Sequence, residues 1–272
     1  MWITSPCMKY KYSIVFWMLY MAAIGCKNVK KPDQQAADAS NTGVIISNDP
    51  NTPDSLRELS VEKLVEQRQY NNAINQINLL LQKDSLNPAW LFMKADAIEK
   101  SGDTVQAILF YEKAIQSAGK FTEASARLAN LFAEKANAQA LAICDLLLKD
   151  PTAASLRSDV LFIEAIYYIR AGQKINSMRI FDQIIKEDYT YLDAYLEKGI
   201  LLFDQKNFTE ARKVFEKSTI VKNSFADGYY WMARCDERLN NKTEAADNYK
   251  RSIALDTGFT EAREALARLQ SN

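Results

Sequence analysis

The sequence predicts an all-α fold, a solenoid of six stacked helical hairpins that ends in a C-terminal capping helix. The main observation is a repeat in which a small residue recurs every 34 residues, from Ala73 to Ala107 and from Ser177 through Ala211 to Ala245. A large apolar or aromatic residue follows each of them four positions later, on the same helix face. A fixed period of this length is typical of stacked helix pairs.

Turn residues inside the repeats indicate the same fold. Four short segments fall between the two predicted helices of their repeats: Ser101-Gly102-Asp103, Ala171-Gly172-Gln173, Lys206-Asn207 and Asn240-Asn241. Gly and Asn tolerate the left-handed backbone conformation that ends a helix. The sequence therefore predicts a hairpin turn at each of these places.

Residues 1–25 have the pattern of a signal peptide. Lys9 and Lys11 precede an apolar run from Ile14 to Ile24. A membrane-spanning helix needs about 20 apolar residues, so this run is too short to span a membrane. Met8 is an alternative start, because translation from it would open directly on the basic residues.

Residues 26–53 are predicted to be a flexible tether. The preceding Ala22-Ala23-Ile24-Gly25-Cys26 resembles the lipobox of bacterial lipoproteins, although that family prefers Leu where Ala23 stands. The resemblance implies that Cys26 is lipidated; the alternative is an ordinary signal peptide or a short signal anchor with an incidental Cys. The tether is too polar to fold alone. Its one apolar run, Val44-Ile45-Ile46, is either incidental or docks on the first repeat.

The repeats in residues 54–272 resemble the tetratricopeptide repeat family. The fifth unit carries the family pattern most fully, through Tyr195, Gly199, Leu202, Phe208, Ala211, Phe215 and Ser218. The resemblance implies a right-handed superhelical solenoid with units at about 54–87, 88–121, 122–153, 158–191, 192–225 and 226–259.

One joint and the last helix depart from the regular repeat. Ala140 and Ser177 are 37 residues apart, and we expect the extra length at residues 152–157. There it either changes the stacking angle, lengthens one helix or forms a tolerated loop. Residues 260–270 have an apolar stripe that includes Ala262 and Ala265, as expected of a helix that caps a solenoid.

Composition argues against catalysis. The 272 residues contain no histidine, which removes Ser–His and Cys–His activation of a nucleophile and the commonest metal ligand. There is no CxxC pair and no glycine-rich phosphate loop among the 8 glycines. The sequence therefore predicts no enzyme activity, no metal site and no cofactor.

The charge balance and the cysteines indicate further what class of protein the sequence encodes. Basic and acidic residues number 34 each, and loss of residues 1–25 would remove only Lys9 and Lys11. Nucleic-acid binding is not expected, because it needs a basic face. Cys144 and Cys235 lie in separate repeats and are predicted to be unpaired and buried, because repeats contact only their neighbours.

Candidate binding residues follow from the family resemblance, in which the first helix of each repeat lines a concave groove. Carried over by position, the predicted partner-binding groove consists of Phe162, Ile166, Ile169, Leu196, Ile200, Phe203, Tyr230 and Arg234. We expect an open apolar surface of this size to bind an apolar peptide or helix of a partner. The alternative is that the joint, superhelical curvature or self-association buries it. The early first helices carry Glu58, Glu62, Asp96 and Glu99, either a solvated face or a site for a basic segment.

The predicted function is a non-catalytic scaffold that binds a protein or peptide partner in this groove. The lipid anchor would hold it in a bacterial cell envelope, at the outer membrane facing the periplasm, since Lys27 after the lipidated Cys is compatible with that sorting. Its architecture resembles the pilotins of type IV pilus secretins and adaptors of envelope assembly. The alternative is a structural protein that forms homo-oligomers through the apolar groove.

Overall fold

The computed structural model describes residues 52–271, which form thirteen α-helices and one 3-10 helix without any strand. The predicted signal peptide, Cys26 and nearly all of the tether lie outside this range. The helices are α2 (Asp54–Glu66), α3 (Tyr70–Lys83), α4 (Pro88–Ser101), α5 (Thr104–Ala118), α6 (Thr122–Glu134), α7 (Gln139–Lys149), η3 (Pro151–Leu156), α8 (Arg157–Arg170), α9 (Lys174–Glu187), α10 (Leu192–Asp204), α11 (Phe208–Val221), α12 (Ala226–Arg238), α13 (Lys242–Leu255) and α14 (Thr260–Ser271).

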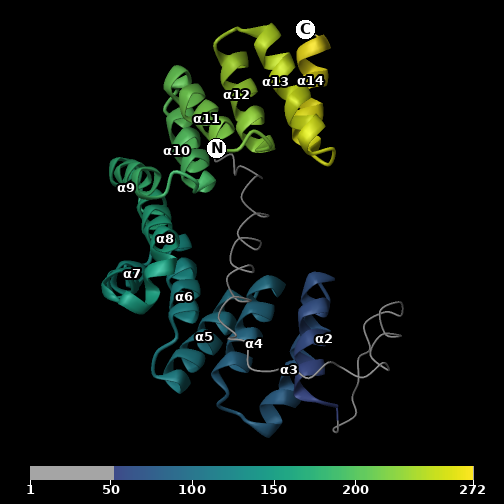
Figure 1. Cartoon of the computed structure of the whole chain (residues 1–272), viewed down its shortest axis with the longest axis vertical. Helices are drawn as coiled ribbons and strands as arrows, with labels where there is room; N and C mark the ends of the chain where they lie inside the picture. Colours follow the sequence, from purple (N-terminus) through teal and green to yellow (C-terminus); the bar gives the residue numbers. More distant parts are fainter. Residues whose placement is uncertain (1–51, 272) are drawn as a thin grey trace. The chain divides into compact units, whose positions relative to one another are not determined.

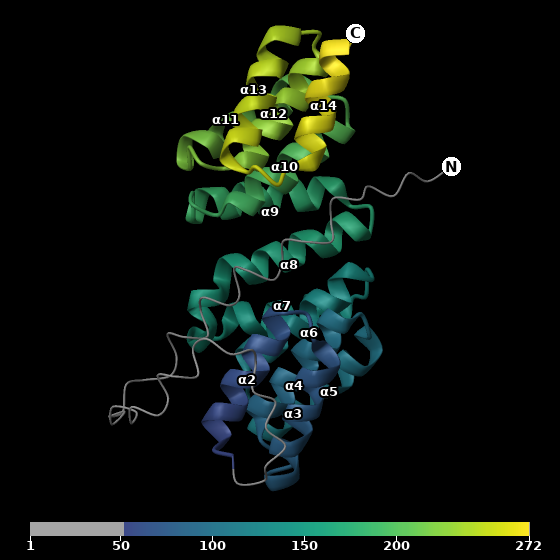
Figure 2. The same cartoon turned by 90° about the vertical axis from the view of Figure 1, so that its right-hand side faces the viewer.

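These helices pair into six hairpins followed by a single helix (Figure 1). Each helix packs against the next one along the chain, so every hairpin contacts the hairpins before and after it (Figure 2). The predicted all-α solenoid of hairpins is therefore confirmed. No helix between residues 52 and 271 has the length and apolar character needed to cross a membrane.

The residues that define the repeat are also the core. Ala211 and Phe215 in α11 and Ala245 and Tyr249 in α13 are all completely buried. A small residue lets the neighbouring helix approach, and the large residue one turn later fills the space between turns. The periodic pattern in the sequence is therefore the packing pattern of the array.

The hairpin turns use left-handed residues, but not always the expected ones. Gly102 and Gly172 have φ values of 100° and 76°, as predicted. In the fifth hairpin the left-handed residue is Lys206 rather than Asn207, and in the sixth it is Asn240. Position in the turn, more than residue type, therefore sets the conformation.

The extra length between the third and fourth hairpins forms η3, which overlaps the predicted segment 152–157 and begins one residue before it. Asp150 caps its start by accepting a 2.9 Å hydrogen bond from the backbone N–H of Thr152. Ala153 and Leu156 are buried, because η3 packs against both α7 and α8. The insertion therefore adds to the core, and α8 packs directly on both helices of the preceding hairpin.

At the C-terminal end, α14 covers the last hairpin as expected of a capping helix. Ala262 and Ala265 are buried. Leu266 and Leu269 pack against the same apolar cluster, which includes Tyr249 of α13.

Candidate partner-binding surface

The side chains of α8 do not form the open groove that the sequence predicts. Phe162 and Ile166 are only 4% and 2% exposed. The ring of Phe162 packs against Phe181 and Tyr191, with centroid distances of 5.7 and 5.6 Å. The expected exposure was wrong here because four elements, α6, α7, η3 and α9, pack on α8. Of the three predicted groove residues on α8, only Ile169, in the last turn, is half-buried.

The predicted residues of α10 and α12 lie together. Phe203 and Tyr230 are buried in one apolar cluster, so they are a correction to the predicted exposed set. Leu196 and Ile200 are half-buried and pack against that cluster from α10. The structure therefore reduces the predicted apolar groove to a smaller surface, Leu196 and Ile200, beside the buried cluster that contains Phe203 and Tyr230.

Arg234 lies over those aromatic rings. Its guanidinium carbon is 5.3 Å from the ring centre of Phe203, 5.2 Å from that of Trp231 and 5.7 Å from that of Tyr230. It also donates a 3.0 Å hydrogen bond to the hydroxyl of Tyr230. Such cation–π contacts contribute about 0.5–2 kcal/mol and hold the guanidinium in place without neutralising its charge.

Arg238, one turn further along α12, extends this arrangement. Its guanidinium carbon is 4.6 Å from the ring centre of Phe208 and 5.9 Å from that of Phe203. Sequence reasoning missed both Arg238 and Trp231. The signal was present, since arginines four residues apart on an aromatic helix share one face. We call Leu196, Ile200, Arg234 and Arg238 the arginine–aliphatic surface.

The two acidic side chains of α12 that lie between these arginines in the sequence already have partners. Asp236 is fully buried and pairs with Arg212 at 2.7 Å. Glu237 pairs with Arg268 at 3.1 Å and accepts a hydrogen bond from Tyr249. Within residues 52–271, neither Arg234 nor Arg238 forms an ion pair with an acidic side chain. Both retain an uncompensated positive charge.

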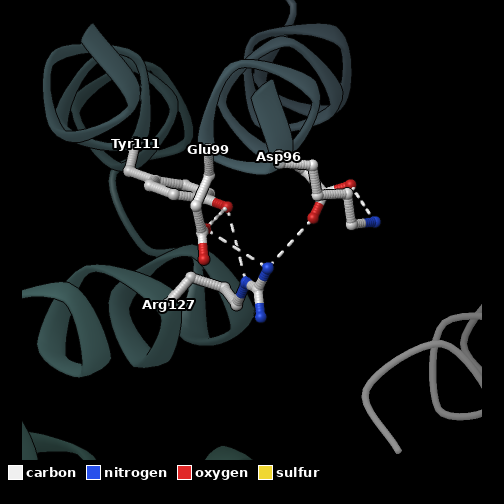
Figure 3. A network of polar contacts seen from close by, with 5 residues as sticks. Asp96, Glu99, Tyr111 and Arg127 are labelled. Atoms are coloured by element: carbon white, nitrogen blue, oxygen red, sulfur yellow. Dashed lines mark hydrogen bonds and ion pairs between the residues drawn. The ribbon is translucent and has the colours of Figure 1, made fainter. Parts of the chain in front are cut away.

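The acidic residues of the early helices serve the interior of the array instead (Figure 3). Buried Arg127 of α6 reaches Asp96 at 3.0 Å and Glu99 at 3.2 Å, both on α4. Tyr111 of α5 donates a 2.7 Å hydrogen bond to Glu99. Burial raises the pKa of Glu99, while Arg127 and the Tyr111 hydroxyl oppose that shift.

The remaining early acidic residues are divided. Glu58 accepts a 2.7 Å hydrogen bond from the indole N–H of Trp90. Burial raises the pKa of Glu62, and the negative charges of Glu58 and Glu66 add to that rise. Three of the four acidic residues, Glu58, Asp96 and Glu99, therefore form contacts between neighbouring helices. This favours a structural role over a site for a basic segment.

The two cysteines of the described residues do not reach these surfaces as exposed thiols. Cys144 and Cys235 are free, buried thiols, and burial raises the pKa of each to about 12. Among residues 52–271, no three His, Cys, Asp or Glu side chains are placed to hold a metal ion. What the arginine–aliphatic surface offers is recognition of another molecule.

The hairpin array and its interhelical packing define the class of protein. Residues 61–120 and residues 192–219 each match the tetratricopeptide repeat family. The chain therefore contains tetratricopeptide repeats, and proteins of this class generally mediate protein–protein interactions.

Particular relatives share the fold at low identity. A tetratricopeptide repeat protein from Parabacteroides merdae is 20% identical with a TM-score of 0.65, covering 82% of this chain and 87% of its own. PilW, described as a type IV pilus biogenesis factor, is 15% identical with a TM-score of 0.65, covering 80% and 99%. Pseudomonas aeruginosa pilF is 15% identical with a TM-score of 0.57, covering 79% and 97%.

A curated relative extends beyond the region of similarity. The DnaJ homolog subfamily C member 7 homolog of Dictyostelium discoideum is 21% identical over 236 residues, which is 79% of this chain. The matched part spans only 42% of that relative's length. At this identity the likeness supports the shared repeat architecture.

Proposed function

We propose that this protein is a lipid-anchored scaffold of a bacterial cell envelope that binds a protein partner over the arginine–aliphatic surface. The observation that carries the proposal is that one surface combines the half-buried side chains of Leu196 and Ile200 with Arg234 and Arg238, neither of which has an acidic partner within residues 52–271. Apolar anchors beside charged groups are typical of protein-binding surfaces.

The N-terminal sequence supports the anchoring part of the proposal. The signal pattern and lipobox-like residues that end at Cys26 would place a lipid on the mature chain, and the polar segment up to Pro53 would separate it from the repeats. Anchoring at the outer membrane, facing the periplasm, would bring the array to envelope complexes. PilW, one of the structures with the same fold, is described as a pilus biogenesis factor.

Photocrosslinking in native membranes tests the binding part. A photoreactive residue at Ile200 is expected to capture a distinct envelope protein. The same residue at Ile175, which is 85% exposed on α9, serves as the control. Capture of only a second copy from Ile200 would favour the self-associating structural protein, and light scattering of the purified chain would then show a stable oligomer. Equal capture from both positions would contradict the proposal.

Lipidation is tested separately. Metabolic labelling with a fatty-acid analogue is expected to label the wild-type protein, while Cys26→Ser abolishes the label and releases the chain from the membrane fraction. Unchanged labelling of the variant would exclude Cys26 as the attachment site, and an unlabelled wild type would favour an ordinary signal peptide or a signal anchor.

A further inference from the structure

Arg234 and Arg238 have the chemistry to recognise carboxylates. A guanidinium carries five N–H donors in a planar fork that matches a carboxylate. Arg234 uses one of these donors in its hydrogen bond to the Tyr230 hydroxyl. Neither arginine forms an ion pair with an acidic side chain within residues 52–271. The aromatic rings beneath hold both guanidiniums at distances of 4.6–5.9 Å from a ring centre.

The apolar neighbours of the arginines indicate what kind of molecule carries those carboxylates. Leu196 and Ile200 are four residues apart on α10 and pack against the cluster that includes Phe203, the ring shared by Arg234 and Arg238. The apolar side chains of α10 and the guanidiniums of α12 therefore contact the same buried apolar cluster. A ligand that fits both needs aliphatic side chains next to negative charge, as an amphipathic acidic peptide has.

We propose that the arginine–aliphatic surface binds an acidic amphipathic segment of the protein partner, with its carboxylates on Arg234 and Arg238 and its aliphatic side chains on Leu196 and Ile200. This inference rests on the proposed function and specifies the chemistry of the partner. The charges are complementary, and the planar guanidiniums are already oriented by the rings, so little side-chain freedom is lost on binding.

Other anionic partners fit the surface less well. Nucleic acids bind through many phosphate contacts, whereas the nearby Arg212 and Arg268 already pair with Asp236 and Glu237. An anionic membrane attracts each basic side chain only weakly and is recognised by larger basic clusters. Two uncompensated arginines beside two aliphatic side chains match a short peptide segment.

Fluorescence anisotropy of the full-length protein in detergent micelles tests the inference with three labelled peptides of matched length. One repeats Leu-Glu-Glu, the second has Gln in place of Glu, and the third has Lys. We expect the Glu peptide to bind at least about tenfold more tightly than the Gln peptide, with an advantage that shrinks as salt is added. The Lys peptide should not bind.

Matched variants connect this binding to the two arginines. Arg234→Gln and Arg238→Gln are each expected to weaken binding of the Glu peptide by about tenfold. Arg251→Gln removes the same charge from an arginine that lies 4.7 Å from the ring centre of Tyr229, and should leave binding unchanged. Circular dichroism of each variant checks that the helices are retained.

Several outcomes would overturn the inference. Equal binding of the Glu and Gln peptides, no binding of the Glu peptide, or equal losses in Arg234→Gln and Arg251→Gln would each do so. Tighter binding to phosphatidylglycerol vesicles than to phosphatidylcholine vesicles that is lost in Arg234→Gln would assign the surface to a membrane. If Ile200 still captures an envelope protein while any of these results holds, the proposed function stands and only the acidic partner is wrong.

Discussion

Tyr111 donates a 2.7 Å hydrogen bond to Glu99, across the two helices of the second hairpin. Tyr249 donates a 2.5 Å hydrogen bond to Glu237 across the sixth hairpin. In each pair the tyrosine follows the glutamate by twelve residues. The same interhelical contact therefore recurs at equivalent places in two distant hairpins.

An arginine of the following helix completes each contact. Arg127 of α6 reaches Glu99 at 3.2 Å, and Arg268 of α14 reaches Glu237 at 3.1 Å. The carboxylate thus links its own hairpin to the next element of the array. The C-terminal capping helix is held by the same polar contact that joins two full repeats.

We expect Tyr111→Phe to lower the free energy of unfolding by about 1–2 kcal/mol, because a partly buried carboxylate loses a hydrogen-bond donor. Urea unfolding at neutral pH measures the change. Tyr189→Phe, at an exposed tyrosine, is the control and should differ from wild type by less than about 0.5 kcal/mol. Equal stability of both variants would show that the Tyr111 contact adds nothing.

Glu197 gives the array a predicted pH dependence. It is 9% exposed, and burial raises the pKa of its carboxyl to about 7. The charges of Asp193, Glu134 and Asp204 push the pKa in the same direction, and Arg170 opposes them. The folded state therefore holds this proton above the pH at which the unfolded chain, with a pKa near 4.5, releases it.

The difference between the folded and unfolded pKa of Glu197 sets how stability changes with pH. The stability contributed by protonated Glu197 is present below about pH 4.5 and is lost as the pH rises through about 7. Glu197→Gln cannot lose it, so the variant should be more stable than wild type at pH 8, by up to about 3 kcal/mol, and similar at pH 4. Thermal unfolding at both pH values measures this. Glu261→Gln, at an exposed position, is the control and should have the stability of wild type at both pH values. A Glu197→Gln effect that is equal at both pH values would contradict the raised pKa of Glu197.

The repeat pattern predicted the fold because its period and its core are the same set of residues. Ala107, Tyr111, Ala211 and Phe215 recur at fixed spacing, and each is completely buried between helices. A pattern that depends on contacts between adjacent repeats is local in the sequence. It could therefore be detected without a structure.

The binding surface could be predicted only in part, since exposure depends on elements outside one repeat. Ile166 and Ile200 occupy equivalent positions in the fourth and fifth units, yet η3 and the third hairpin pack on α8 and Ile166 is buried while Ile200 is half-buried. The insertion was visible as extra length, but its packing was not. Likewise, the charge of Arg234 was visible, but its lack of an acidic partner among the residues that the structure describes depends on how Glu237 and Arg268 pair.

The different burial of Ile166 and Ile200 predicts that a glutamate at each position will have a different effect. Ile166→Glu should destabilise the array by at least about 3 kcal/mol, because it buries a charge and removes core packing. Ile200→Glu should retain the fold and lose partner capture, because that side chain is half-buried at the arginine–aliphatic surface. Circular dichroism and urea unfolding separate the two effects. Similar unfolding of both variants would show that Ile200 is also a core residue.

Gly199 is predicted to be required by the ring of Phe215. A Cβ atom at Gly199 would lie 2.4 Å from Cε1 and 2.5 Å from Cζ of that ring. The ring has little freedom to move, since Phe215 is completely buried and stacks on Trp231 with centroids 5.6 Å apart. Because Trp231 also lies beneath Arg234, a displacement would reach the arginine–aliphatic surface.

Gly199→Ala should therefore destabilise the array by about 1–3 kcal/mol, even though alanine favours a helix over glycine by about 1 kcal/mol. Urea unfolding measures the loss, and a change in tryptophan emission would report a shift of Trp231. Gly258→Ala, whose added Cβ would meet only the side chain of Asp256 at 3.1 Å, is the control and should be close to wild type. Phe215→Leu should cost less in the Gly199→Ala background than alone, because the smaller side chain relieves the clash. Strictly additive losses would mean that the two residues do not compete for the same space.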